Sequence, residues 1–305
     1  YYSMTKVSLS QSIHGCLFGL MIGDALGASV EFMRASEIKT LHKCGVREMQ
    51  NGEGLCKARK VGVITDDTEM SLCLMESLIS ANGWNKSRAR YNYRIWLLSA
   101  PPDVGTTIRD SLFGSINPKS QANGALMRIA PLACWAATHQ GFDWEKATAE
   151  DAMLTHVNQV CIDANLVYVY SLIRAITTRV RNVKNLYEES ILWAKEHKLS
   201  ESVIHCMLAA SKNPPEYDGE HIGWVLVALQ GSYYQLLHAR NFEEALINTV
   251  SAGGDTDTNA AICGALLGAF YGIRQIPQRW ISQVQKSNPQ STEDVQIFFR
   301  ECMGM

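Results

Sequence analysis

The sequence predicts an all-α fold of about ten or more helices. Apolar residues recur at helical spacing along most of the chain, and hardly any stretch shows the two-residue alternation of a half-buried strand. Clusters of Gly, Asn, Asp and Pro separate the apolar stretches, as turns do between helices. The 305 residues are 47% hydrophobic, so a large core can form. Because no linker or low-complexity stretch interrupts the chain, we expect residues 1–305 to form a single domain.

The first predicted helix carries an unusual face of glycines. Gly15, Gly19, Gly23 and Gly27 recur every four residues, which places them all on one side of a helix. Glycine costs nearly 1 kcal/mol per helical position relative to alanine, so the pattern needs a reason. We predict that a second helix packs closely against this face, and we assign the glycines themselves no chemistry.

Later helices are indicated by apolar residues at spacings of three and four. These residues are Met70, Leu74 and Leu78; Ile162, Leu166, Val169 and Ile173; Val225, Leu229, Tyr233 and Leu236; and Ile262, Leu266 and Phe270. Turns are predicted at Asn51-Gly52, Pro101-Pro102-Asp103, Asn117-Pro118 and Asn213-Pro214-Pro215.

Composition excludes several classes of function. A formal net charge of −2 and a pI near 6.5 leave no basic stripe, so we expect no nucleic-acid partner. Arg88, Arg90 and Arg94 fit a solvated helix face. The apolar run from Cys16 to Gly23 is far shorter than the ~20 residues that span a bilayer, so we expect no membrane span. We also expect a monomer.

The nine cysteines form no CxxC pattern, which argues against a zinc site. Their scatter through apolar stretches predicts reduced, mostly buried thiols and a cytoplasmic location. No signal peptide is evident, and Tyr1-Tyr2-Ser3 before Met4 resembles a tag remnant. We therefore expect residues 1–11 to be tag remnant and flexible N-terminus.

Two acidic segments indicate a metal site. Thr65-Asp66-Asp67-Thr68 and Gly253-Gly254-Asp255-Thr256-Asp257-Thr258 each precede or open a predicted helix. Helix capping accounts for one such residue per helix, but not for two pairs of clustered carboxylates, which repel one another unless a cation neutralises them. With no Cys ligands and no paired His nearby, oxygen ligands favour Mg²⁺ or Mn²⁺.

The motifs together resemble the ADP-ribosylglycohydrolase family. The resemblance runs in family order from about residue 12 to 272 and includes Gly15-xxx-Gly19-xxx-Gly23-Asp24-Ala25-Leu26-Gly27-xxx-Glu31-Phe32, both acidic segments, Asn123-Gly124-Ala125-Leu126-Met127-Arg128-Ile129-Ala130-Pro131 and Thr155-His156. It implies a compact orthogonal multi-helix bundle with a binuclear metal cleft that holds two divalent cations, Mg²⁺ or Mn²⁺.

The resemblance also assigns site residues. It implies metal ligation by Thr65, Asp66, Asp67, Asp255, Asp257 and Thr258. Glu31 matches a glutamate near the scissile bond, and an ADP-ribose pocket is implied at Asn123, Gly124, Ala125 and His156. Either Asp66, Asp67 or Glu31 would act as the base. For adenine stacking we favour Trp224, then Tyr217.

The stretch Trp96–Arg109 distinguishes the linkage. Its Asp103-Val104-Gly105 is similar to the branch of dinitrogenase reductase-activating glycohydrolases, which release ADP-ribose from arginine. A carboxylate pairs well with a guanidinium, so Asp103 would steady the departing group. Without the resemblance, Asp103 is a turn or cap residue.

The predicted function is therefore metal-dependent removal of ADP-ribose from an ADP-ribosylated arginine on a protein. Alternatives are a serine or O-acetyl-ADP-ribose linkage, or a non-catalytic ADP-ribose-binding relative. A metal-free glycosidase pair would leave the extra aspartates unexplained. A metal-dependent phosphohydrolase would be expected to carry His-Asp ligand pairs, and no His adjoins either acidic segment.

Overall fold

The computed structural model describes residues 7–178 and 181–305. Within them the chain forms fifteen α-helices, two 3-10 helices and no strand, so the all-α prediction is confirmed. The α-helices are α1 (Leu9–Gly27), α2 (Ala35–Leu41), α3 (Asp66–Ala81), α4 (Lys86–Leu98), α5 (Thr106–Leu112), α6 (Ala130–Ala136), α7 (Trp144–Met153), α8 (Gln159–Thr177), α9 (Val183–Glu196), α10 (Glu201–Ala210), α11 (Val225–His238), α12 (Phe242–Ser251), α13 (Thr256–Tyr271), α14 (Gln278–Ser287) and α15 (Pro289–Met303). The 3-10 helices are η1 (Gly54–Cys56) and η2 (Ile273–Gln275).

Helix α1 begins earlier than expected for a flexible N-terminus. Ser8 caps it, accepting a hydrogen bond from the Gln11 backbone N–H, while the Gln11 side chain accepts from the Ser8 N–H. This reciprocal cap fixes the first turn. Residues 9–11 thus form the start of α1, and the expected tag remnant at Tyr1–Ser3 lies outside the described residues.

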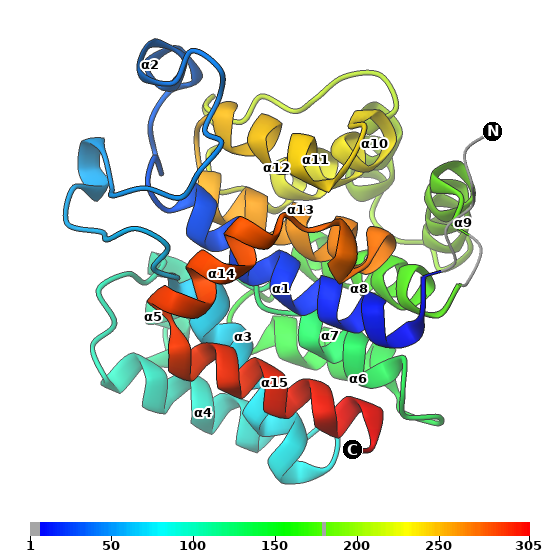
Figure 1. The fold of residues 1–305 in the computed structure, drawn as a ribbon. Helices are drawn as coiled ribbons and strands as arrows, with labels where there is room; N and C mark the ends of the chain where they lie inside the picture. Colours follow the sequence, from blue (N-terminus) through cyan, green and yellow to red (C-terminus); the bar gives the residue numbers. More distant parts are fainter. Residues whose placement is uncertain (1–6, 179–180) are drawn as a thin grey trace.

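Helices α1 and α13 lie side by side through the middle of the bundle (Figure 1). The glycine face of α1 meets a matching stripe on α13: Gly15 faces Gly268, Gly19 faces Gly264, and Gly23 faces Ala260. A Cβ added at any of these α1 positions would overlap backbone atoms of α13. The predicted close helix contact is confirmed, and it brings the C-terminal end of α1 to the N-terminal end of α13.

We expect Gly23→Ala to destabilise the protein by about 1–3 kcal/mol, because a new methyl group cannot displace the backbone of Ala260 and Ala261. On an exposed helix the same change would stabilise by nearly 1 kcal/mol. The sign of the change in unfolding free energy, measured by urea denaturation, tests this packing. A more stable variant would contradict it.

The other helices surround this central pair. Helices α11 and α12 pack on α13 on one side, and α3 packs with α4, α6 and α15 on another (Figure 1). Helix α8 has the length and hydropathy of a membrane span, but 67% of that window is buried inside the protein. It packs against α6, α7, α9, α11 and α13 and is accounted for as a core helix.

The cysteines and the arginines of α4 were also assigned an environment from composition. Seven of the nine cysteines are buried and all are free thiols, as predicted; Cys44 is exposed and Cys73 half-buried. On α4, Arg88 and Arg94 are exposed, as expected for a solvated helix face.

Candidate active site

Helix ends bring the two acidic segments together. The C-terminal end of α1 carries Asp24, followed by Glu31, and packs against the first turns of both α3 and α13. Helix α3 opens with Asp66 and Asp67, and Asp257 stands in the first turn of α13. Segments about 190 residues apart in the sequence therefore share one buried cluster, in which the Thr258 hydroxyl donates to Asp67 Oδ2 at 3.4 Å.

Asp24 organises the first turn of α3. Its buried carboxylate accepts hydrogen bonds from the backbone N–H and the hydroxyl of both Thr65 and Thr68. These bonds satisfy donors that a helix N-terminus otherwise leaves unpaired. Capping at α3 thus comes from a distant aspartate, which leaves Asp66 and Asp67 free of that duty.

The second acidic segment turns sharply before α13. Gly253 and Gly254 have φ of 76° and 78°, a region that favours glycine. The Gly254 N–H donates to Met33 O at 2.9 Å, and Gly254 O accepts from the Phe32 N–H at 2.7 Å. This turn fixes Asp255, whose Oδ2 accepts a 2.7 Å hydrogen bond from Asn123 Nδ2.

The cluster has the features of a cation site. Carboxylate oxygens of Asp24, Asp67 and Asp257 lie within 4.8 Å of one another, and Asp67 Oδ1 is buried with no hydrogen-bond donor among the described residues. Burial raises the pKa of Asp66, Asp67 and Asp257 well above the usual range, and repulsion between neighbouring carboxylates raises it further. Divalent metal ions would relieve this repulsion, so the residues fit the predicted metal centre.

A single arginine binds the outer carboxylates. Arg59 Nη2 lies 2.6 Å from Glu31 Oε2 and also pairs with Asp103 Oδ2, while Nη1 lies 3.2 Å from Asp257 Oδ2. Burial, together with repulsion by Asp255, raises the pKa of Glu31 to about 7, although Arg59 opposes the shift. Asp103, predicted from the α4–α5 turn, therefore does face the acidic cluster.

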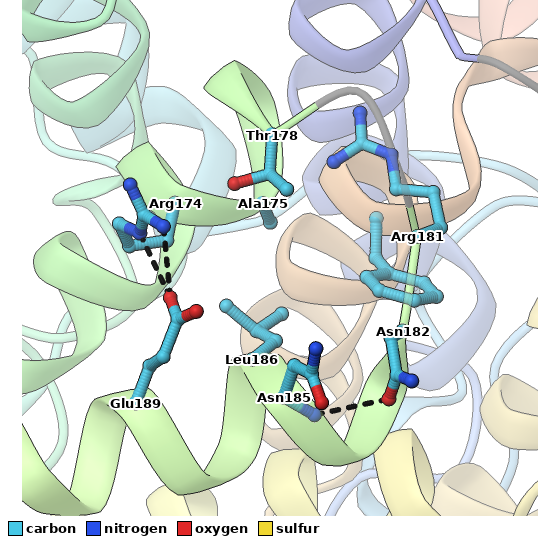
Figure 2. Close-up of a pocket in the computed structure, with 9 residues that line it drawn as sticks. Arg174, Ala175, Thr178, Arg181, Asn182, Asn185, Leu186 and Glu189 are labelled. Carbon is cyan, nitrogen blue, oxygen red and sulfur yellow. Dashed lines mark hydrogen bonds and ion pairs between the residues drawn. The ribbon is translucent and has the colours of Figure 1, made fainter.

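The cluster opens into a pocket of about 600 Å³, lined by Glu31, Thr65, Asp66, Arg59 and Asp103 among others. A second pocket, of only about 50 Å³, lies between α8 and α9 and is lined by other residues (Figure 2). There Arg174 pairs with Glu189 at 2.9 Å. The large pocket is the one with room for a nucleotide-sized ligand beside the carboxylates.

A family model described as ADP-ribosylglycohydrolase matches residues 5–302. The chain belongs to the ADP-ribosylglycohydrolase family. Membership confirms the family suggested by the motifs and makes the protein a hydrolase of ADP-ribose linkages.

Known ADP-ribosylglycohydrolases match along nearly the whole chain. ADP-ribosyl-[dinitrogen reductase] glycohydrolase of Rhodospirillum rubrum is 31% identical over 290 residues, covering 92% of each chain. ADP-ribosylarginine hydrolase Tri1 of Serratia proteamaculans is 25% identical and covers 93% of this chain and 78% of its own. A solved structure titled ADP-ribosylglycohydrolase-related protein complex aligns with a TM-score of 0.81 at 26% identity, over 97% of this chain and 99% of that one.

Two residues predicted for the ADP-ribose pocket of this ADP-ribosylglycohydrolase pack together. A Cβ on Gly124 would stand 3.1 Å from His156 Cε1, so the missing side chain lets the ring approach the backbone. Burial, together with the positive charge of Arg128, lowers the pKa of His156 to about 3, so the ring is neutral. Its Nδ1 is hydrogen-bonded to the Thr155 hydroxyl at 2.8 Å. Neither residue lines the 600 Å³ pocket.

The other predicted pocket residues differ in their exposure. Trp224 is 38% exposed, stacks on His221 and pairs through its backbone with Ala122, next to Asn123. Ala125 is buried against Ala152 and Ile162 and does not line the 600 Å³ pocket. Tyr217, the second choice for adenine stacking, has its ring buried against Gly231 and does not line that pocket either.

Three features of the site were missed by sequence reasoning. Arg59 stands between Lys57 and Lys60 with no motif around it; only the need for a counter-charge near the carboxylates could have indicated it. Asp24 was noted in the motif without its capping role. Arg128, also in a quoted motif, is fully buried, pairs with Asp151 at 3.0 Å and donates to Thr155 Oγ1 at 2.9 Å. This network holds the segment that carries His156.

Proposed function

We propose that this protein acts in the cytoplasm and removes ADP-ribose from arginine side chains of a protein substrate. The single observation that carries the proposal is the guanidinium of Arg59, which Glu31, Asp103 and Asp257 bind inside the cleft. A site that holds one guanidinium through several carboxylates has the charge and shape for the departing group of ADP-ribosyl-arginine. The arginine hydrolase named among the relatives supports the same linkage.

The metal ligands in this proposal are those that the motifs indicated: Thr65, Asp66, Asp67, Asp255, Asp257 and Thr258. Two divalent ions, Mg²⁺ or Mn²⁺, would bind ribose hydroxyls and water and make that water a stronger nucleophile. Asp24 positions Thr65 by accepting hydrogen bonds from the Thr65 backbone N–H and hydroxyl. Asn123 positions Asp255 by donating a hydrogen bond to it.

Side chains of the protein would accept the proton of the attacking water and bind the departing guanidinium. Glu31 and Asp66 line the large pocket, whereas Asp67 is fully buried beneath them. Glu31 or Asp66 is therefore better placed than Asp67 to accept the proton of an attacking water. Asp103, at the pocket wall, pairs with the guanidinium of the substrate. As the C–N bond breaks, its electron pair goes to the guanidine nitrogen, the attacking water loses a proton to the base, and the departing guanidine takes up a proton and leaves as the guanidinium that Asp103 binds.

The test compares peptides carrying ADP-ribose on arginine or on serine, each with Mn²⁺ or with EDTA, and follows release of ADP-ribose. We expect release from the arginine peptide in Mn²⁺ and little from the serine peptide. Preferential release from serine would reassign the linkage. Binding of ADP-ribose without release from either peptide would favour the non-catalytic relative.

A further inference from the structure

Arg59 fills space in the acidic cleft that a bound metal and substrate would share. The carboxylate oxygens of Glu31, Asp103 and Asp257 lie within 4.8 Å of one another, close enough to bind one cation together. These are the three carboxylates that the Arg59 guanidinium now contacts. The trio is therefore a cation site with an internal occupant.

Asp257 is the carboxylate that both Arg59 and a metal ion would bind. Its Oδ1 accepts a hydrogen bond from the Thr258 N–H at 3.0 Å, and its Oδ2 accepts from Arg59 Nη1 at 3.2 Å. Both oxygens thus have partners within the protein. A divalent ion bound to Oδ2 would place a second cation beside the Arg59 guanidinium on the same oxygen, and two cations in such contact repel strongly in a buried site.

The Arg59 backbone is anchored, so release of the guanidinium requires movement of the side chain alone and loss of its 2.9 Å hydrogen bond from Nη1 to Ala28 O. The Arg59 N–H donates to Cys56 O at 2.8 Å, and Arg59 O accepts from the Gly52 N–H at 2.9 Å, so the main chain is anchored. The side chain is 20% exposed and borders the 600 Å³ pocket. Rotation about its flexible bonds would carry the guanidinium into that space.

We propose that Arg59 is a displaceable internal cation, which neutralises Glu31, Asp103 and Asp257 in the metal-free protein and is released from Asp257 when a divalent ion binds. This inference rests on the metal dependence in the proposed function. Metal binding and Arg59 binding then compete for Asp257. Removing the guanidinium strengthens metal binding and weakens the metal-free fold.

The experiment titrates wild type and Arg59→Gln with Mn²⁺ by calorimetry and measures melting temperatures in EDTA and in Mn²⁺. We expect Arg59→Gln to bind Mn²⁺ about tenfold more tightly or better, the scale set by one charge-assisted hydrogen bond. In EDTA its melting temperature falls below that of wild type, because the carboxylates lose their counter-charge. Its gain in melting temperature on adding Mn²⁺ is correspondingly larger.

Two further variants complete the design. Arg59→Lys keeps the charge but not the planar fork, so its Mn²⁺ affinity falls between the other two. Arg240→Gln, an arginine 86% exposed on the surface, serves as the matched control and binds as wild type. Mn²⁺ affinity in Arg59→Gln equal to or weaker than in wild type overturns this inference and leaves the proposed function standing. Failure of wild type itself to bind Mn²⁺ overturns the metal dependence instead.

Discussion

Asp257→Ala is expected to lower turnover by about a thousandfold or more and to weaken Mn²⁺ binding, while the fold survives. Asp257 belongs to both groups of oxygens that could hold a cation, one with Asp24 and Asp67 and one with Glu31 and Asp103. Metal ions stabilise a transition state by several kcal/mol, and each 1.36 kcal/mol changes the rate tenfold. No other carboxylate of the cluster is shared by the two groups.

The measurement pairs single-turnover release of ADP-ribose with calorimetric titration by Mn²⁺. Asp257→Asn keeps the shape but loses the charge, so it should recover little. Glu188→Ala, an exposed carboxylate on α9, is the matched control and should behave as wild type. Unchanged stoichiometry and affinity for Mn²⁺ in Asp257→Ala would refute its role as a ligand.

The close helix contact at the centre of the fold was predictable because a short stretch of sequence, the glycine pattern of α1, indicates it. Four glycines at four-residue spacing indicate a helix face that another backbone can approach, and α13 meets that face with Gly264 and Gly268. The sequence did not identify α13 as the partner helix. The pairing depends on residues roughly 250 positions downstream, and the periodicity of one helix does not indicate which distant helix packs against it.

The acidic segments were predictable for a similar reason. Adjacent carboxylates at a helix start exceed what capping requires, and the motif order then indicated the family. The structure brings carboxylate oxygens of Asp67 and Asp257 within 4.8 Å of each other, and Asp66 lies near Asp67. Asp103 was the least certain member from residues alone, since a turn after two prolines explains an aspartate equally well.

The roles of Arg59 and Asp24 could not be predicted from the sequence, because they depend on tertiary contacts alone. Arg59 lies in a stretch with no periodicity, so nothing local distinguishes it from the solvated Lys57 and Lys60 beside it. The role of Asp24 as the cap of α3 depends on a helix 41 residues away in sequence. Buried charges need partners, but the partners are known only after folding.

Asp103→Ala should reduce hydrolysis of ADP-ribosyl-arginine far more than it reduces binding of free ADP-ribose. Asp103 faces a guanidinium in this structure, that of Arg59, and free ADP-ribose contains no guanidinium. Loss of a hydrogen bond to a charged group costs about 1.5–3 kcal/mol, or roughly tenfold to a hundredfold in rate.

Three measurements on each variant separate a substrate contact from a turn residue: single-turnover release, ADP-ribose affinity and melting temperature. Asp103→Asn should recover little activity, because the amide keeps the shape of the side chain but not its charge. Asp110 lies on α5, pairs with Arg109 and has a side chain that is 46% exposed, so Asp110→Ala is the control for a lost surface charge. If Asp103 only shapes the α4–α5 turn, Asp103→Ala will melt at a lower temperature but keep its turnover per folded molecule. An equal loss of affinity for free ADP-ribose would place Asp103 at the nucleotide instead of at the arginine.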